Sequence, residues 1–154
     1  MGKIDQRLAE LGITLPEAAK PVANYVPWVR TGNLVFISGQ GPMDNGKITL
    51  QGHLGNDISL EDGIKSARLC AINVVAQLKD ACGGDLDRVK RVVKLLGFVN
   101  ATADFKDHPK VINGASDLMV EIFGDKGRHA RSAVAAPSLP FGISTEVEAV
   151  IEIE

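Results

Sequence analysis

Residues 130–154 read ARSAVAAPSLPFGISTEVEAVIEIE, and this stretch predicts two strands separated by a loop. Within 144–154 apolar and acidic residues alternate, so that the valine, alanine and isoleucine side chains face one way and the glutamates the other. The apolar run 130–136 predicts the preceding strand, and PSLPFG predicts the loop. We expect the two strands to pair as antiparallel neighbours, which would bring Arg131 and Glu146 toward the same end of the sheet.

Apolar residues at spacings of three and four predict two long helices. The first is expected from Ser59 to Cys82, because Ser59 and Asp62 match a loose capping box and Gly-Gly-Asp follows. The second is expected to begin near Asp107, which can cap it, with Pro109 in its first turn. The other predicted elements are a short helix over 3–11, an edge segment over 21–31 broken by Pro27, and strands over 34–40, near 48–50 and over 91–102.

This order of elements predicts an α+β fold in which both long helices cover one face of a mostly antiparallel sheet. Helices on one side leave the other face of the sheet without cover. Apolar residues on that face would be hidden from water if the chain associated with copies of itself. The length of 154 residues suits a single domain spanning 1–154.

The composition is that of an ordinary globular protein, with 45% hydrophobic residues, 23% charged residues and a formal net charge of −2. No basic face or stripe indicates a nucleic-acid partner, and no stretch approaches the roughly 18 apolar residues of a membrane span. The first residues lack the apolar core of a signal peptide. Cys70 and Cys82 lie too far apart on one helix to bridge each other. We therefore expect a cytoplasmic protein with free thiols.

Few residues carry a recognisable chemical signature. The sequence has no P-loop and no GxSxG motif, and SGQGPMDNG lacks the spacing of a dinucleotide site. His53, His108 and His129 are scattered, so surface or capping roles are expected and a metal site is not. Arg131 stands out because a fixed charge adjoins a small apolar run. On residue types alone, it either forms a structural ion pair with Glu146 or is available to an anionic ligand.

Several segments together resemble one known family. ARSAVAAPSLPFGISTEVEAVIEI resembles the C-terminal signature of the RidA (YjgF-type) enamine/imine deaminases, with its Arg-Ser, Leu-Pro and Glu-x-Glu-Ala. GNLVFISGQGP, residues 32–42, resembles the N-terminal signature with its Ser-Gly-Gln. INVVAQLKDACGGDLDRVKRVVKLLGFVN resembles the central helix and strand, and VINGASDLMVEIFG the second helix. The resemblance runs from about residue 21 to the end, so residues 1–20 read as an N-terminal extension.

The resemblance implies a chorismate-mutase-like fold that assembles as a homotrimer with three clefts between subunits. It implies hydrolysis of reactive 2-imino acids, formed from enamines such as 2-aminoacrylate, to 2-oxo acids and ammonia, without a metal or organic cofactor. Carried over by position, Arg131 would hold the substrate carboxylate and Glu146 would position or activate the attacking water. The other implied cleft residues are Tyr25, Gly39 through its amide, Asn113, and Ala133 through its carbonyl.

The sequence also departs from the family pattern. Ala133 stands where many members have cysteine, which removes any thiol chemistry, and NYVPW surrounds Tyr25 in place of the usual residues. A second interpretation is therefore a non-catalytic trimer that uses Arg131 to sense a small carboxylate metabolite. A third, an RNA-acting protein, is disfavoured by the acidic balance and by an aromatic content of only 5%.

Overall fold

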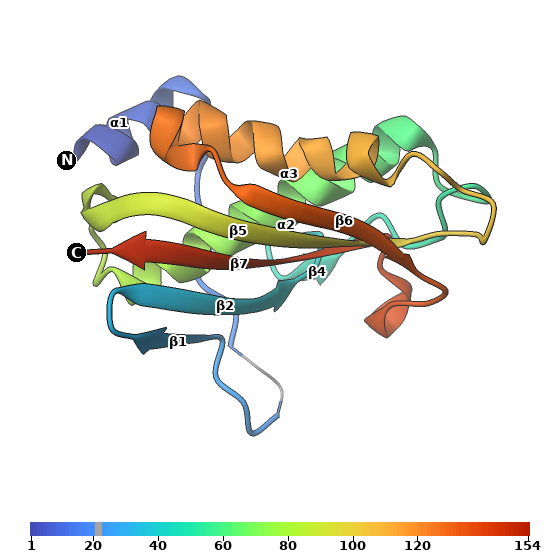
Figure 1. Ribbon diagram of the computed structural model, residues 1–154, viewed down its shortest axis with the longest axis horizontal. Coiled ribbons are helices and arrows are strands. Elements are labelled where there is room, and N and C mark those ends of the chain that lie inside the picture. Colours follow the sequence, from blue (N-terminus) through green and yellow to red (C-terminus); the bar gives the residue numbers. More distant parts are fainter. Residues whose placement is uncertain (21–22) are drawn as a thin grey trace.

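The computed structural model describes residues 1–20 and 23–154, and its main feature is a five-stranded sheet in the order β1-β2-β7-β5-β6 (Figure 1). The two strands β3 and β4 form a separate small ribbon. The elements are α1 (Lys3–Glu10), β1 (Trp28–Thr31), β2 (Leu34–Gln40), β3 (Met43–Asp44), β4 (Lys47–Ile48), α2 (Leu60–Ala81), β5 (Val89–Asn100), α3 (His108–Phe123), β6 (Ala130–Ala136) and β7 (Thr145–Ile153). Short 3₁₀ turns η1 (Leu86–Arg88), η2 (Gly124–Gly127) and η3 (Pro140–Gly142) lie between them.

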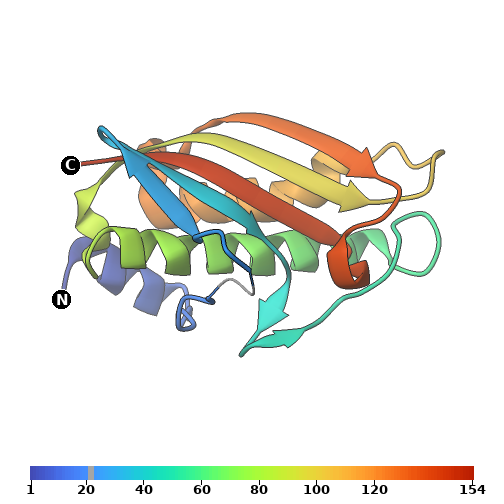
Figure 2. The same cartoon turned by 90° about the horizontal axis from the view of Figure 1, so that it is seen from below.

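Helices α2 and α3 lie on the same face of the sheet, and Figure 2 shows them together on one side of the strands. The apolar stripes of both helices and the inward side chains of β7, among them Val147 and Ile151, form the core. Three of the sheet's pairings are antiparallel and one, β5 with β6, is parallel. The predicted α+β fold, with two helices on one face of a mixed sheet, is therefore confirmed.

The predicted pairing of the last two strands is wrong. Strand β5 lies between β6 and β7, parallel to β6 and antiparallel to β7. The reason is the helical crossover: β5, α3 and β6 form a β-α-β unit, and a crossover of this kind returns the chain parallel to the strand that it left. The segment after β6 then passes the end of β5 and enters the sheet on its other side (Figure 1).

The two helix starts differ in their capping. Ser59 caps α2 as predicted, because its Oγ accepts a hydrogen bond of 3.1 Å from the backbone N–H of Asp62. Asp107 occupies the cap position of α3 but its side chain makes no capping bond there. Its carboxylate lies 3.6 Å from Lys110 Nζ instead, so the prediction of a side-chain cap at Asp107 is wrong.

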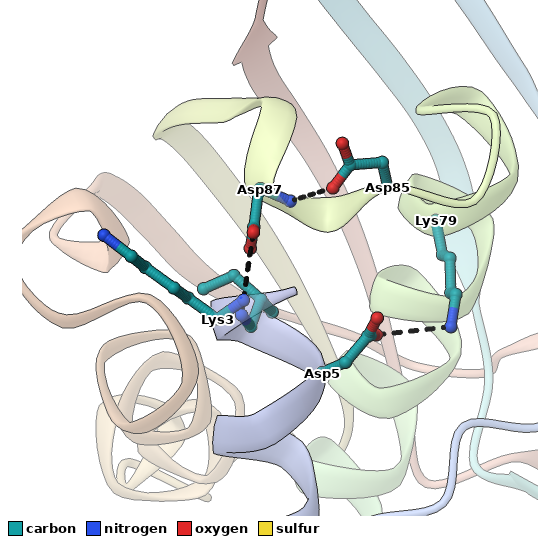
Figure 3. A network of polar contacts seen from close by, with 6 residues as sticks. Lys3, Asp5, Lys79, Asp85 and Asp87 are labelled. Atoms are coloured by element: carbon teal, nitrogen blue, oxygen red, sulfur yellow. Dashed lines mark hydrogen bonds and ion pairs between the residues drawn. The ribbon is translucent and has the colours of Figure 1, made fainter. Parts of the chain in front are cut away.

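The N-terminal segment is fastened to the domain by a polar network, which Figure 3 shows. The Asp87 carboxylate accepts hydrogen bonds of 2.9 Å from the backbone N–H groups of Lys3 and Ile4, and so caps α1 from outside the helix. Asp5 forms an ion pair with Lys79 of α2 at 3.4 Å. Leu8 is buried in the core. Residues 1–20 therefore contribute to the packing around the helices and not to the sheet.

The face of the sheet opposite the helices is apolar and open to solvent. Phe36 of β2 and Val134 of β6 are each 44% exposed, although both lie on regular strands. An apolar hollow of about 410 Å³ lies on this face, lined by Phe36, Leu96, Val150 and Glu148 among others. The open face thus fits the uncovered sheet surface predicted from the order of elements.

In the described ranges, no helix is long and apolar enough to cross a bilayer.

Candidate functional site

Arg131 lies near the start of β6, the edge strand beside α3, and its side chain is turned toward that helix. Arg131 Nη1 donates hydrogen bonds to Asn113 Oδ1 at 2.8 Å and to Ser116 Oγ at 3.2 Å. Asn113 and Ser116 are three residues apart on α3, so both side chains lie on one helix face. We call Arg131, Asn113 and Ser116 the anchor.

The anchor leaves part of the guanidinium free. A guanidinium carries five N–H donors, and both of the bonds given above start from Nη1. The edge formed by Nε and Nη2 therefore has no acceptor among the residues that the structure describes, and no carboxylate neutralises Arg131 there. A guanidinium edge of this kind accepts a carboxylate through two parallel hydrogen bonds.

Glu146 lies at the start of β7 on the open face of the sheet and is half-buried. Burial, and after it the charge of Glu148, raises the pKa of the Glu146 carboxyl above its ordinary value of 4.5. Among residues 1–20 and 23–154, no side chain forms an ion pair with it. A carboxylate that is partly desolvated and unpaired in this way is a good proton acceptor.

Gly39, which the resemblance implied as a backbone donor in the cleft, lies against this carboxyl group. A Cβ atom at Gly39 would fall 2.7 Å from Glu146 Cδ and 2.8 Å from its Oε1, so a larger residue there would push the carboxyl group out of this position. The register of β2 against β7 shifts between Ile37 and Gln40, which places Gly39 in the irregular part of the strand. We call Glu146 and Gly39 the acid site.

The anchor and the acid site are separate within one chain. Arg131 pairs with Leu95 of β5, and Leu95 with Ala149 of β7, so these three side chains share the helix-covered face. Glu146 pairs with Phe98 on the opposite face. The offset is three residues along the strands and two strand spacings across the sheet, roughly 10 Å in each direction. The ion pair between Arg131 and Glu146 that the sequence left open does not form in this chain.

The other residues predicted for the cleft lie in two places, beside Arg131 and in the loop before β1. Asn113 belongs to the anchor, and Ala133 follows Arg131 on β6, half-buried against the core. Tyr25 lies in the loop before β1 and is 55% exposed, next to Val26, which lines the hollow on the open face. The predicted edge segment 21–31 begins with residues 21 and 22, which lie outside the described residues.

Two residues around Arg131 were not predicted, one in the anchor and one beside it. Ser116 bonds Arg131 directly, and His129 Nε2 lies 2.8 Å from Ser116 Oγ. A surface or capping role was expected for His129. The available signal was the spacing of Asn113 and Ser116 on one helix face, and the two-residue spacing of His129 and Arg131 at the start of β6. It could not be used without knowing that α3 lies beside β6.

A cluster of buried polar side chains lies beneath the acid site, between β7 and α2. Ser144 Oγ donates to Ser66 Oγ at 2.8 Å, Ser66 Oγ also bonds Thr145 Oγ1, and Cys70 Sγ lies 3.2 Å from Thr145 Oγ1. Burial raises the pKa of the Cys70 thiol to about 12, so this cysteine is a structural residue and not a nucleophile. The cluster satisfies its own hydrogen bonds and fixes the strand end that carries Glu146.

A metal centre is not indicated by the described residues. Within them, no group of three or more histidine, cysteine, aspartate or glutamate side chains gathers as metal ligands would. His53 bonds the carbonyl of Pro137, and His108 packs edge-on against Phe105. These contacts are structural and suit the roles predicted for both histidines.

A mixed sheet with one helix-covered and one open face, with an unpaired guanidinium and an unpaired carboxylate on its two sides in the described chain, defines a small α+β protein of the chorismate-mutase-like class. The family model described as "YjgF/chorismate_mutase-like, putative endoribonuclease" matches residues 5–152 of this chain. The chain therefore belongs to the YjgF/RidA family.

Individual relatives cover nearly the whole chain. Protein TCP17 of Trypanosoma cruzi is 46% identical over 99% of this chain and 95% of its own length. The crystal structure of Atu1372 from Agrobacterium tumefaciens matches with a TM-score of 0.93 and 48% identity, over 98% of this chain and 92% of that one. A "putative endoribonuclease" from Shewanella oneidensis matches with a TM-score of 0.95 and 39% identity, over 99% and 100%.

Proposed function

We propose that this protein hydrolyses small 2-imino acids to 2-oxo acids and ammonia, in sites that two subunits of a homotrimer build together. The observation that carries the proposal is the free Nε/Nη2 edge of Arg131, since nothing in the described chain neutralises it. A charged group held in place by neutral partners is suited to an anionic ligand. A 2-imino acid offers a carboxylate next to the carbon that reacts.

The reaction needs little beyond orientation, water and a proton acceptor. Water attacks the C=N carbon, a C–O bond forms, and the π electron pair moves to nitrogen. The carbinolamine then loses ammonia: the C–N bond breaks, and the hydroxyl proton leaves as the C=O bond forms. The reaction needs no oxidant or reductant, because the substrate carbon has the same oxidation state in the imine and in the ketone. Arg131 would fix the carboxylate, so that the neighbouring carbon meets the water in one orientation.

Glu146 would take the proton from the attacking water and return it to the leaving nitrogen. Its pKa lies above 4.5 because burial and Glu148 both disfavour the charged form. A raised pKa makes the carboxylate a stronger base toward the attacking water. Gly39 lets this carboxyl group pack against the backbone of β2, because a side chain at position 39 would force it to move.

Assembly is needed because Arg131 and Glu146 of one chain face opposite sides of the sheet. A small imino acid cannot bridge them there. The apolar open face, with Phe36, Val134 and the hollow, is the surface that a second copy would cover. We infer that the anchor of one copy meets the acid site of the next, and a closed ring of three repeats this contact at every boundary.

A binding protein on the same trimer is the alternative, and it would use Arg131 to bind a carboxylate without turnover.

The family is also described as putative endoribonucleases, which suggests phosphodiester cleavage as another activity. The anchor offers one guanidinium, and the hollow on the open face is mainly apolar with one lysine, Lys94, and one glutamate, Glu148, which is not the basic groove that tracks an RNA strand. We therefore retain the imine hydrolase as the proposed function.

The test is release of 2-oxo acid and ammonia from imines generated in situ by an amino-acid oxidase. The wild type should accelerate both products. Arg131→Ala should lose activity by roughly a hundredfold, because a bidentate charge-assisted contact is removed. Arg128→Ala is the matched control, since Arg128 is an exposed arginine three positions away whose ion pair is with Asp125. Carboxylate binding without turnover would support the sensor instead, and neither binding nor turnover would overturn both.

A further inference from the structure

We propose that Ser116 and His129 are positioning residues for Arg131, which orient its guanidinium through a hydrogen-bonded chain of fixed direction. The proposal rests on the proposed carboxylate site and adds to it how the anchor is held. The chain of contacts runs from the backbone carbonyl of Gly127 through the imidazole of His129 and the hydroxyl of Ser116 to Arg131.

The direction of each hydrogen bond follows from the chemistry of its ends. A carbonyl oxygen only accepts, so the 2.7 Å contact between Gly127 O and His129 Nδ1 requires a proton on Nδ1. In a neutral ring, Nε2 is then an acceptor, and the Ser116 hydroxyl donates to it at 2.8 Å. The Ser116 oxygen is left as an acceptor for the N–H of Arg131 at 3.2 Å.

The ring of His129 is in the state that this chain requires. Burial lowers the pKa of His129 below 6.5; the bond to the Gly127 carbonyl opposes this in part, and the charge of Arg131 adds a smaller lowering. His129 is therefore neutral near pH 7. A protonated ring would instead donate from Nε2, and the Ser116 hydroxyl would have to find another acceptor.

The backbone supports the same arrangement. Gly127 is the buried last residue of η2, where a Cβ would collide with the carbonyl oxygen of Met119, so only glycine fits at the position whose carbonyl bonds His129. His129 and Arg131 are two residues apart and point to the same side. From one face of α3, Asn113 contacts Arg131, and Ser116 contacts both Arg131 and His129.

The consequence for Arg131 is a fixed orientation. One N–H of Nη1 points to Asn113 and the other to Ser116, which sets the plane of the guanidinium. The Nε/Nη2 edge is then presented in a single direction. Without Ser116, the side chain would keep one bond and could rotate about it, so that part of the binding free energy of a carboxylate would be spent on ordering the arginine.

The structural part of the proposal is tested by the tautomer of His129. Nitrogen-15 NMR of the imidazole at pH 7.5 should show a proton on Nδ1 and a bare Nε2. The Ser116→Ala variant should shift the Nε2 signal, because that nitrogen loses its donor. A proton on Nε2 in the wild type would overturn the proposed direction of the chain, whatever the protein's activity.

The functional part is tested with Ser116→Ala and Ser116→Thr, which differ in the hydroxyl. Dissociation constants for pyruvate, a 2-oxo acid, and steady-state constants for the imine are measured for each. Ser116→Ala should raise both the pyruvate Kd and the KM by roughly tenfold, with kcat changed less than threefold, because carboxylate binding is shared by ground and transition states. Ser116→Thr should restore both values, and His129→Phe should behave like Ser116→Ala.

The two levels of the proposal fail in different ways. If the wild type neither binds pyruvate nor turns over imines, the proposed function fails. If the wild type binds, Arg131→Ala does not, and Ser116→Ala binds as well as wild type, only the positioning role is overturned. Equal losses in Ser116→Ala and Ser116→Thr would also contradict it, because they would reflect packing and not the hydroxyl.

Discussion

Arg131 and Glu146 lie on opposite faces of the same sheet, three residues apart along its strands and separated by β5. The sequence suggested either an ion pair or a joint site for these two residues. Their separation excludes both within a single chain. It also explains why each keeps a free polar edge, since neither can be neutralised by the other.

Complementation between inactive variants is the first expected outcome. Arg131→Ala keeps Glu146, and Glu146→Gln keeps Arg131, so a boundary with the right pair of subunits contains one intact anchor and one intact acid. Random co-assembly of equal amounts should restore about a quarter of the sites. The measurement is ammonia release after the two variants are unfolded together and refolded. Mixing them without subunit exchange is the control, and no recovery after co-refolding would contradict a shared site.

The acid limb of the pH–activity profile should be controlled by Glu146. Because its pKa is raised, activity should be lost as pH falls through a value above 4.5, where the carboxylate becomes protonated. Glu148→Gln removes the like charge that contributes to this shift, and should move the limb to lower pH. The measurement is kcat/KM as a function of pH for both proteins. A limb that stays in place in Glu148→Gln would show that Glu148 does not influence the acid.

Glu146→Gln should abolish turnover without destabilising the fold. The wild-type carboxyl is partly desolvated, close to Glu148 and without an ion-pair partner in the described chain, so an uncharged amide of the same shape removes an unfavourable interaction. We expect activity to fall by at least roughly a hundredfold while Tm is unchanged or higher. Thermal unfolding followed by circular dichroism provides the check. A marked fall in Tm would mean that Glu146 makes a stabilising contact in the assembly.

Stability should decrease on mild acidification because of His129. Its pKa is lower in the folded protein than the value of 6.5 expected for the unfolded chain, so the unfolded state binds the proton more readily. The free energy of unfolding should therefore fall as pH drops below about 6.5 toward the lowered pKa. Urea unfolding between pH 5 and 8 measures this. His129→Gln should flatten that part of the curve, and an unchanged slope would assign the effect to another group.

The attachment of α1 should depend on Asp87. Its carboxylate accepts from the N–H groups of Ile4 and Lys3, which lowers the pKa of Asp87 below 3.8. The attachment is thus complete above that pH and is lost as pH falls through the lowered pKa. Asp87→Ala should speed amide hydrogen exchange in residues 3–10 and leave α2 protected. Asp125→Ala, which removes only an exposed ion pair with Arg128, is the control.

Local patterns predicted most of the elements because their causes are local. The spacing of apolar residues located α2 and α3, and alternation located β7, close to their observed bounds. Ser59 capped its helix as expected, whereas Asp107 did not, because its carboxylate is engaged with Lys110. A capping residue is identified by type, but its use depends on competing partners nearby.

The sequence by itself determined the class of fold and the division of the sheet into a helix-covered and an open face. It also identified Arg131 and Glu146 as candidate residues. Hydrophobic periodicity and side-chain chemistry are local properties, so they can be recognised without the tertiary structure. Only the tertiary structure decided that β5 separates β6 from β7, and that Ser116 and His129 meet Arg131. These relationships join segments brought together by the crossover of α3 and by helix packing. Such contacts arise from burying the whole core, and no local pattern specifies them.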